Sequence, residues 1–129
     1  MNIAFEKYNG LVPTIIQDGT TGEVLMLGFM NEEALAETQR TQRAVFFSRS
    51  RNKLWRKGES SGHVLKVLEI RVDCDSDTLL VRVQAVGPGV CHEGYRSCFH
   101  RKLEKDGAAT VTEERAFAPE EVYGRSSQA

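Results

Sequence analysis

Hydrophobic and polar residues alternate along several short stretches of the chain, and a two-residue period is typical of β-strands. The clearest stretch is residues 64–73, where we expect a long and mostly buried strand. The other predicted strands are residues 12–17, 23–29, 44–49, 78–86 and 95–103. Turn-forming residues separate these strands at residues 18–22, 75–77, 87–89 and 106–107. The first of these turns joins its two flanking strands into a predicted hairpin.

One segment has the composition of a well-formed helix. Asn31 is a good N-cap residue, and Glu32 and Glu33 place negative charge in the first turn, where the helix dipole favours it. The sequence therefore predicts a helix that begins after Asn31 and runs to about Arg40.

The rest of the pattern is irregular. Residues 54–62 read as a polar loop with Trp55 as a large aromatic anchor. Near the end of the chain, Pro119 can open a short helix that Gly124 can close. The whole pattern predicts a strand-rich, antiparallel α+β domain with one main helix.

Size and charge narrow the class of protein. The 129 residues are enough for one domain, so we treat residues 1–129 as a single unit. With 17 basic and 18 acidic residues the chain lacks the basic excess of a general nucleic-acid binder. No apolar run is long enough to cross a membrane, and the N-terminus lacks the order of a signal peptide. The three cysteines cannot all pair within one chain, which favours the reducing cytoplasm.

The basic residues are unevenly distributed. Seven of them fall in residues 40–57, namely Arg40, Arg43, Arg49, Arg51, Lys53, Arg56 and Lys57. This run is either a solvated face or a local attractor for an anionic small molecule such as a phosphate ester. Residues 48–51 and 55–62 add hydroxyl groups and glycine backbone that can wrap phosphates, although neither is a Walker or dinucleotide fingerprint.

Three aspartates, Asp73, Asp75 and Asp77, lie close to the first cysteine, Cys74. Thiolates suit zinc, whereas carboxylates suit magnesium or manganese. On an extended segment the aspartates would point one way and Cys74 the other, which implies two separate sites. A turn at residues 75–77 would disturb that alternation, and ordinary turn-forming aspartates are the plain alternative.

The other two cysteines, Cys91 and Cys98, follow in one downstream loop. Three thiolates would leave the fourth tetrahedral position of zinc open for water, as in catalytic sites. Three buried cysteines that only pack as small hydrophobes are the alternative. His92 adjoins Cys91 and is a zinc ligand, a proton shuttle or an ordinary loop residue; we favour proton transfer.

Taken together, these segments resemble the phosphoribosyl-AMP cyclohydrolase family. The matching stretches are residues 17–18, 22–27, 29–31, 46–51, 54–62, 73–77 and 91–99, which lie in the family's order within residues 11–99. The Trp-x-Lys-Gly-Glu-x-Ser-Gly and Asp-Cys-Asp-x-Asp motifs are highly specific. The chain departs from the family at Glu93, where threonine is more usual, and at Phe29, which is often tyrosine. Residues 100–129 form a C-terminal extension beyond the motifs.

The resemblance implies two metals and a dimer. Cys74, Cys91 and Cys98 would bind zinc, and Asp73, Asp75 and Asp77 would bind magnesium. The family forms intertwined homodimers in which Cys74 comes from one subunit and Cys91 and Cys98 come from the other. The partners implied are therefore a second copy of the chain and a small phosphorylated nucleotide, with no nucleic acid and no membrane.

The resemblance also implies a reaction, the zinc-dependent hydrolytic opening of the N1–C6 bond of the adenine ring in 1-(5-phosphoribosyl)-AMP. This hydrolase step of histidine biosynthesis gives a phosphoribosyl-formimino carboxamide ribotide. His92 would transfer protons. The candidate substrate contacts are Arg49, Arg51, Trp55, Lys57, Glu59, Ser60 and Ser61. About thirty residues follow Phe99, too few for the helical phosphoribosyl-ATP pyrophosphohydrolase domain found in fused relatives, so we expect the cyclohydrolase step alone.

Two other classes of protein are alternatives to this family. Purine and pyrimidine deaminases carry His-x-Glu and Pro-Cys-x-x-Cys motifs, and this sequence has neither. A non-catalytic zinc-stapled binding domain would need a fourth protein ligand, for which His92 is the nearby candidate. An exchangeable water on zinc would favour the enzyme, and a closed Cys-Cys-Cys-His site would favour the staple.

Overall fold

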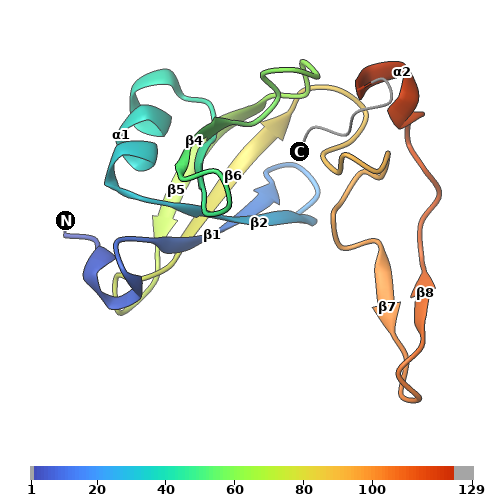
Figure 1. Ribbon diagram of the computed structural model, residues 1–129, viewed down its shortest axis with the longest axis horizontal. Coiled ribbons are helices and arrows are strands. Elements are labelled where there is room, and N and C mark those ends of the chain that lie inside the picture. The colour runs from blue at the N-terminus through green and yellow to red at the C-terminus, as the bar shows by residue number, and fades with distance from the viewer. Residues whose placement is uncertain (1, 124–129) are drawn as a thin grey trace.

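Figure 1 shows the computed structural model of the protein. The structure is described here for residues 2–123. The helices and strands, in chain order, are η1 (Phe5–Tyr8, a 3-10 helix), β1 (Val12–Asp18), β2 (Val24–Met30), α1 (Glu32–Thr41), β3 (Val45–Ser48), β4 (Lys53–Arg56), β5 (Leu65–Val72), β6 (Leu79–Ala85), β7 (Arg101–Leu103), β8 (Ala109–Val111) and α2 (Pro119–Tyr123). The strand-rich α+β class with one main helix is confirmed. No helix in the described part of the chain is long and apolar enough to span a bilayer.

The central sheet has the strand order β2-β1-β6-β5. Its two outer pairs, β1 with β2 and β5 with β6, are antiparallel, as the sequence predicted. The central pair, β1 with β6, is parallel, so the prediction of an antiparallel sheet was wrong for this contact. Local alternation sets which face of a strand is buried, but it carries no information about the direction of a partner far away in the sequence.

Strands β1 and β6 supply the centre of the core. Val12, Ile16, Leu79, Val81 and Val83 on these strands are all fully buried. Strand β5 lies at the sheet edge, and among its residues only Leu65 is buried while Leu68 is 58% exposed. The expectation of a mostly buried strand at residues 64–73 was therefore wrong in burial, because an edge strand has a sheet neighbour on one side only.

Helix α1 is capped as its sequence predicts, and it is attached to the strand that follows it. The Asn31 side chain accepts a hydrogen bond from the backbone N–H of Ala34 at 2.8 Å, which confirms the N-cap. On the buried side of the helix, the Thr38 hydroxyl oxygen accepts a hydrogen bond from the backbone N–H of Val45 at 3.0 Å. This contact ties α1 to the first residue of β3 and so positions the second sheet.

The second sheet is the β3–β4 hairpin, in which Phe46 pairs with Trp55. The predicted polar loop at residues 54–62 was wrong in its first part, because residues 54–56 belong to strand β4. The centres of the Phe46 and Trp55 rings lie 5.4 Å apart, and such cross-strand aromatic pairs stabilise a strand. The polar residues that follow Trp55 made this segment look like a loop in the sequence. Residues 57–62 form the turn that was expected.

The β7–β8 hairpin projects away from the rest of the molecule (Figure 1). Its turn contains Gly107, at φ +92°, as predicted. The strand predicted at residues 95–103 was right only for residues 101–103; residues 95–100 form an irregular loop. Helix α2 begins at Pro119 as expected, and Gly124, its predicted end, lies outside the described residues.

Candidate functional site

Two of the three cysteines meet in the loop that follows β6. The backbone N–H of Cys91 donates to the carbonyl of Tyr95 at 3.0 Å, and the N–H of Cys98 donates to the carbonyl of Leu25 on β2 at 2.7 Å. The two thiols are hydrogen-bonded to each other, which lowers the pKa of Cys91 to about 5 and raises that of Cys98. The pair therefore loses its first proton easily, because the remaining thiol stabilises the thiolate.

Lys57 brings a positive charge to this pair. Its side chain is buried, and the ammonium donates a hydrogen bond to the carbonyl of Val90 at 2.7 Å. Burial lowers the pKa of Lys57, while the nearby Cys98 and Cys91 act to raise it. The sequence placed Lys57 among the phosphate contacts of a surface loop, whereas the structure places its ammonium beside the cysteines.

His92 and a second histidine, His100, flank the thiols. His92 is half-buried, and a positive charge on either ring would lower the pKa of Cys91 further. His100 is buried and stacks on Tyr95, with ring centroids 3.7 Å apart and planes 6° from parallel. Its Nδ1 lies 3.2 Å from the carbonyl of Ser97, which assigns the ring proton to Nδ1. Sequence reasoning missed His100, although its position two residues after Cys98 was a usable signal.

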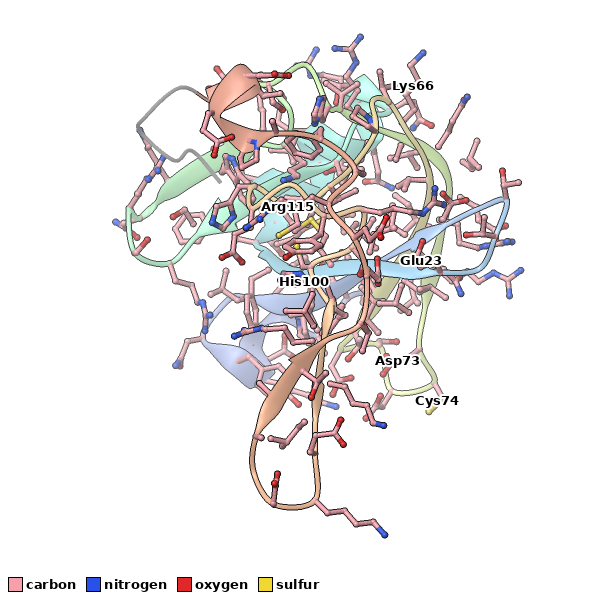
Figure 2. The ribbon with its side chains drawn as sticks, turned by 90° about the vertical axis from the view of Figure 1, so that its right-hand side faces the viewer. Glu23, Lys66, Asp73, Cys74, His100 and Arg115 are labelled. Carbon is pink, nitrogen blue, oxygen red and sulfur yellow. The ribbon has the colours of Figure 1, made fainter. Side chains whose placement is uncertain are left out.

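Cys74 does not join this cluster within one chain. It is exposed, on the turn between β5 and β6, and Figure 2 shows it at the edge of the molecule, apart from His100. Among residues 2–123, only the three aspartates bring three potential metal-ligating side chains together. A single subunit therefore assembles two of the three predicted zinc ligands.

The ligand atoms of Asp73, Asp75 and Asp77 all lie within 4.8 Å of one another. The segment is a turn rather than an extended strand, with Ser76 at φ +63°. One oxygen of Asp73 accepts hydrogen bonds from the backbone N–H groups of Asp77 (3.0 Å) and Thr78 (3.1 Å). The turn therefore gathers the carboxylates instead of scattering them.

The cluster is partly neutralised by a lysine from the other end of the chain. The ammonium of Lys7, on η1, lies 3.2 Å from Asp77 and 3.7 Å from Asp75. The pKa of Asp75 is raised, first by hydrogen bonding of its carboxyl group to Asp73 and then to Asp77, and repulsion between the negative charges adds to the effect. Sequence reasoning missed Lys7, because 70 positions separate it from Asp77 and no local pattern links the two.

Arg49, Arg51 and Trp55 gather in another place. They line a cavity of about 250 Å³ at the turn of the β3–β4 hairpin. The guanidinium of Arg49 lies 4.0 Å above the centre of the Phe29 ring, so the aromatic residue at that position holds the cation.

The remaining candidate substrate contacts lie in the loop after β4. Ser60 is exposed, and the Ser61 hydroxyl accepts a hydrogen bond from the N–H of His63 at 3.1 Å. Glu59 is exposed and lines a second cavity. The loop is tight at Gly58, where φ is +85° and an added Cβ would lie 2.5 Å from the backbone nitrogen of Val64.

The C-terminal extension reaches back to the cysteine loop. We call residues 115–117 the C-terminal strap. The N–H groups of Ala116 (2.7 Å) and Phe117 (3.2 Å) donate to the carbonyl of Gly94. The guanidinium of Arg115 donates to the carbonyl of Glu93 at 2.9 Å and lies 5.2 Å from the Tyr95 ring centre, close to His100 in Figure 2.

The strap also joins two loops. Phe117 meets the His63 ring edge-on at 4.9 Å, so one segment contacts both the cysteine loop and the loop after β4. The Nδ1 atom of His63 is buried and has no hydrogen-bond partner among the described residues. Nothing in the sequence of the extension indicated this role.

The fold and the clustered side chains define the class: a small mixed-sheet α+β enzyme, with a thiol pair beside a buried lysine and histidine. Comparison with known proteins identifies the family. The sequence profile of phosphoribosyl-AMP cyclohydrolase matches residues 26–100. A phosphoribosyl-AMP cyclohydrolase of Solibacter usitatus is 55% identical over 127 residues, covering 98% of this chain and 100% of the relative. One of Pelotomaculum thermopropionicum is 56% identical over 121 residues, covering 92% and 93%.

The chain belongs to the phosphoribosyl-AMP cyclohydrolase family, as the resemblance predicted. The matched residues include every candidate metal ligand and substrate contact named from the sequence. Lys7 and the C-terminal strap lie outside that stretch, although the Solibacter usitatus relative aligns with nearly the whole chain.

Proposed function

We propose that the protein hydrolyses 1-(5-phosphoribosyl)-AMP in histidine biosynthesis and opens the adenine ring at the N1–C6 bond. The observation that carries this proposal is the hydrogen-bonded Cys91–Cys98 pair beside Lys57, in a chain of this family. The free thiols favour a cytoplasmic location, where cysteines stay reduced.

The thiol pair fits zinc in its donor chemistry. Zinc prefers thiolates, and the lowered pKa of Cys91 makes one available near neutral pH. We infer that Cys91 and Cys98 of one subunit hold the ion together with Cys74 of the partner subunit. When bound in this way, zinc supplies the activation of water for attack on the ring.

The β7–β8 hairpin supports the dimer. An isolated two-stranded hairpin is at best marginally stable in water, yet all six of its strand residues are exposed in one subunit. By the pairing register, Leu103, Ala109 and Val111 share one face, on which Leu103 is 77% and Val111 52% exposed. Arg101, which pairs with Val111, lies on the same face, and a second copy of the chain that covers the apolar side chains there would stabilise the hairpin.

The aspartate cluster fits magnesium. The ligand atoms of the three carboxylates lie within 4.8 Å of one another, and one of these groups has a raised pKa. A hard divalent cation bound among them would reduce the repulsion between their negative charges. Lys7 offers only one positive charge to this cluster. We infer that Asp73, Asp75 and Asp77 are the magnesium ligands.

The chain's own residues have to orient the ring and move protons. We infer that a nitrogen of the His92 ring accepts a proton from the water that attacks C6. The oxygen of that water becomes the carboxamide oxygen, the N1–C6 bond breaks, and N1 gains a proton as it leaves. Lys57 and the cations of residues 49–51 hold the substrate in place for this step.

The direct test is to incubate the purified protein with phosphoribosyl-AMP, zinc and magnesium, and to follow the ultraviolet change of ring opening. We expect turnover in the wild type. Cys91→Ala should lose zinc and activity together, because it removes a ligand. Asp75→Asn should keep zinc but need more magnesium, since the amide keeps the shape and loses the charge. Absence of ring opening by the metal-loaded wild type would refute the assignment, and zinc loss in Asp75→Asn would refute separate metal sites.

A further inference from the structure

A cavity of about 770 Å³ opens where the β3–β4 hairpin ends and β5 begins. Its lining includes four cations and one carboxylate, Arg43, Arg56, Lys57, Lys66 and Glu59. Lys66 is labelled near the top of Figure 2. Arg43 and Lys66 belong to none of the sites described above.

The backbone forces Arg43 and Lys66 together. They are directly opposite each other in an antiparallel bridge, a position in which like charges destabilise the pairing. Within residues 2–123, neither side chain forms an ion pair with an acidic residue. An anion that lies between the two cations would offset their mutual repulsion.

The other charges around the cavity do not cancel this excess. Arg56 lies 3.3 Å from Glu37, but the same carboxylate also pairs with Arg40 at 2.8 Å. Glu59 is the one acidic side chain in the lining. The cavity therefore keeps a positive potential, which is what a doubly charged phosphate ester requires.

The cavity adjoins the thiol pair through a single residue. Lys57 lines the cavity, and its ammonium reaches the carbonyl of Val90 beside Cys91. Its backbone N–H also donates to the carbonyl of Ala44, the neighbour of Arg43, at 3.3 Å. A ligand in the cavity is thus separated from the reacting centre by the length of one lysine side chain.

We propose that this cavity binds a phosphomonoester on a ribose, with Arg43 and Lys66 as its principal ligands. Its volume is in the range of small-molecule sites, and an arginine beside a lysine suits a dianionic phosphate. The identity of the ligand rests on the proposed function, whose substrate carries a ribose phosphate at each end. The second group of cations, Arg49 and Arg51, lies at the opposite end of the same hairpin, so the two phosphates have separate sites.

The test uses ribose 5-phosphate and inorganic phosphate as probes of the full-length protein, with binding followed by amide chemical shifts. We expect shifts at Arg43, Gly58 and Lys66, and affinity about tenfold weaker in Arg43→Gln and in Lys66→Gln, since each loses one charge-assisted hydrogen bond. Arg71→Gln removes a positive charge from the same strand outside the cavity, and its affinity should equal that of the wild type.

Turnover provides the second measurement. In Arg43→Gln and Lys66→Gln, the KM for phosphoribosyl-AMP should rise about tenfold while kcat stays within about twofold, since uniform binding is lost. Probe shifts confined to other residues, or unchanged affinity in both variants, would overturn the cavity assignment. Probe binding that depends on Arg43, in a wild type that opens no ring, would refute the proposed function and leave the assignment standing.

Discussion

Asp18 shows how one side chain fixes a turn and a distant loop together. One carboxylate oxygen accepts hydrogen bonds from the backbone N–H groups of Thr20 (2.8 Å) and Thr21 (3.0 Å), and the other lies 3.3 Å from the guanidinium of Arg96. The Thr21 hydrogen bond is the largest of the effects that lower the pKa of Asp18. Because Arg96 belongs to the cysteine loop, this carboxylate connects the β1–β2 turn to the thiol pair.

Asp18→Asn should cost about 1–2 kcal/mol of unfolding free energy at pH 7, because the amide oxygen still accepts the turn hydrogen bonds but lacks the charge that strengthens them and pairs with Arg96. The pKa is lowered in the folded state, so the contribution is complete above the unfolded value of about 4 and is lost as the pH falls through the folded value. The difference between wild type and variant should therefore shrink below about pH 4. Urea unfolding across this range measures it. Asp106→Asn, which removes the charge from a carboxylate that accepts one turn hydrogen bond and forms no ion pair among the described residues, is the control. A constant difference down to pH 2 would contradict the charge argument.

The proposed proton-transfer role of His92 can be tested with a single substitution. His92→Ala should retain both metals and lose about 10²–10⁴-fold in kcat, the usual range for a general acid or base. Atomic spectroscopy of metal content alongside the rate separates a proton-transfer role from a ligand role. An undiminished rate removes His92 from the mechanism, and zinc loss makes it a ligand.

At the scale of elements, the C-terminal strap closes over the cysteine loop through a glycine. Gly94 has φ +98°, and an added Cβ would lie 2.5 Å from the carbonyl oxygen of Phe117. The close approach lets the carbonyl of Gly94 accept both strap hydrogen bonds. The loop that holds Cys91 and Cys98 is therefore shaped partly by residues outside the stretch that the family profile matches.

Gly94→Ala and Gly107→Ala form a matched pair. Gly107 has φ +92° and nothing within 4 Å of an added Cβ. Because φ is similar at Gly94 and Gly107, backbone strain should destabilise both variants by the same amount, about 1–3 kcal/mol. Only Gly94→Ala should also displace the strap, for a further loss of about 1–3 kcal/mol from crowding. Urea unfolding gives the energies, and the reaction of Cys91 with a thiol reagent reports loop opening. Equal stability and equal thiol reactivity in the two variants would show that the strap does not constrain the loop.

At the scale of the whole molecule, the separation of Cys74 from the other two cysteines makes the dimer testable. A mixture of Cys74→Ala and Cys91→Ala chains should recover about a quarter of the wild-type rate, since half the dimers are mixed and each has one intact site. Cys91→Ala mixed with Cys98→Ala should recover nothing, because both ligands come from the same subunit. Mass spectrometry verifies that mixed dimers form. Failure of the first mixture to recover activity would place each zinc within one subunit, and recovery in the second would show that Cys91 and Cys98 of one site come from different subunits.

The sequence by itself determined the local features of this protein. The N-cap at Asn31, the alternation that forms β1 and β6, and the turn at Asp106–Gly107 each depend on residues a few positions apart. The three aspartates were likewise predicted as a group, because their spacing on one short turn leaves little freedom. The kind of metal that each group of side chains suits could also be predicted, since it depends on residue type more than on surroundings.

Only the tertiary structure decided what those features meet. It brought Lys7 to Asp77, Lys57 to the thiol pair, and the strap to Gly94. It also set β1 parallel to β6 and made β5 an edge strand. These contacts join segments that are far apart in the chain, and they depend on which apolar faces are buried together rather than on any local preference. Local patterns determine what each segment can form, and burial over the whole chain determines which segments become neighbours.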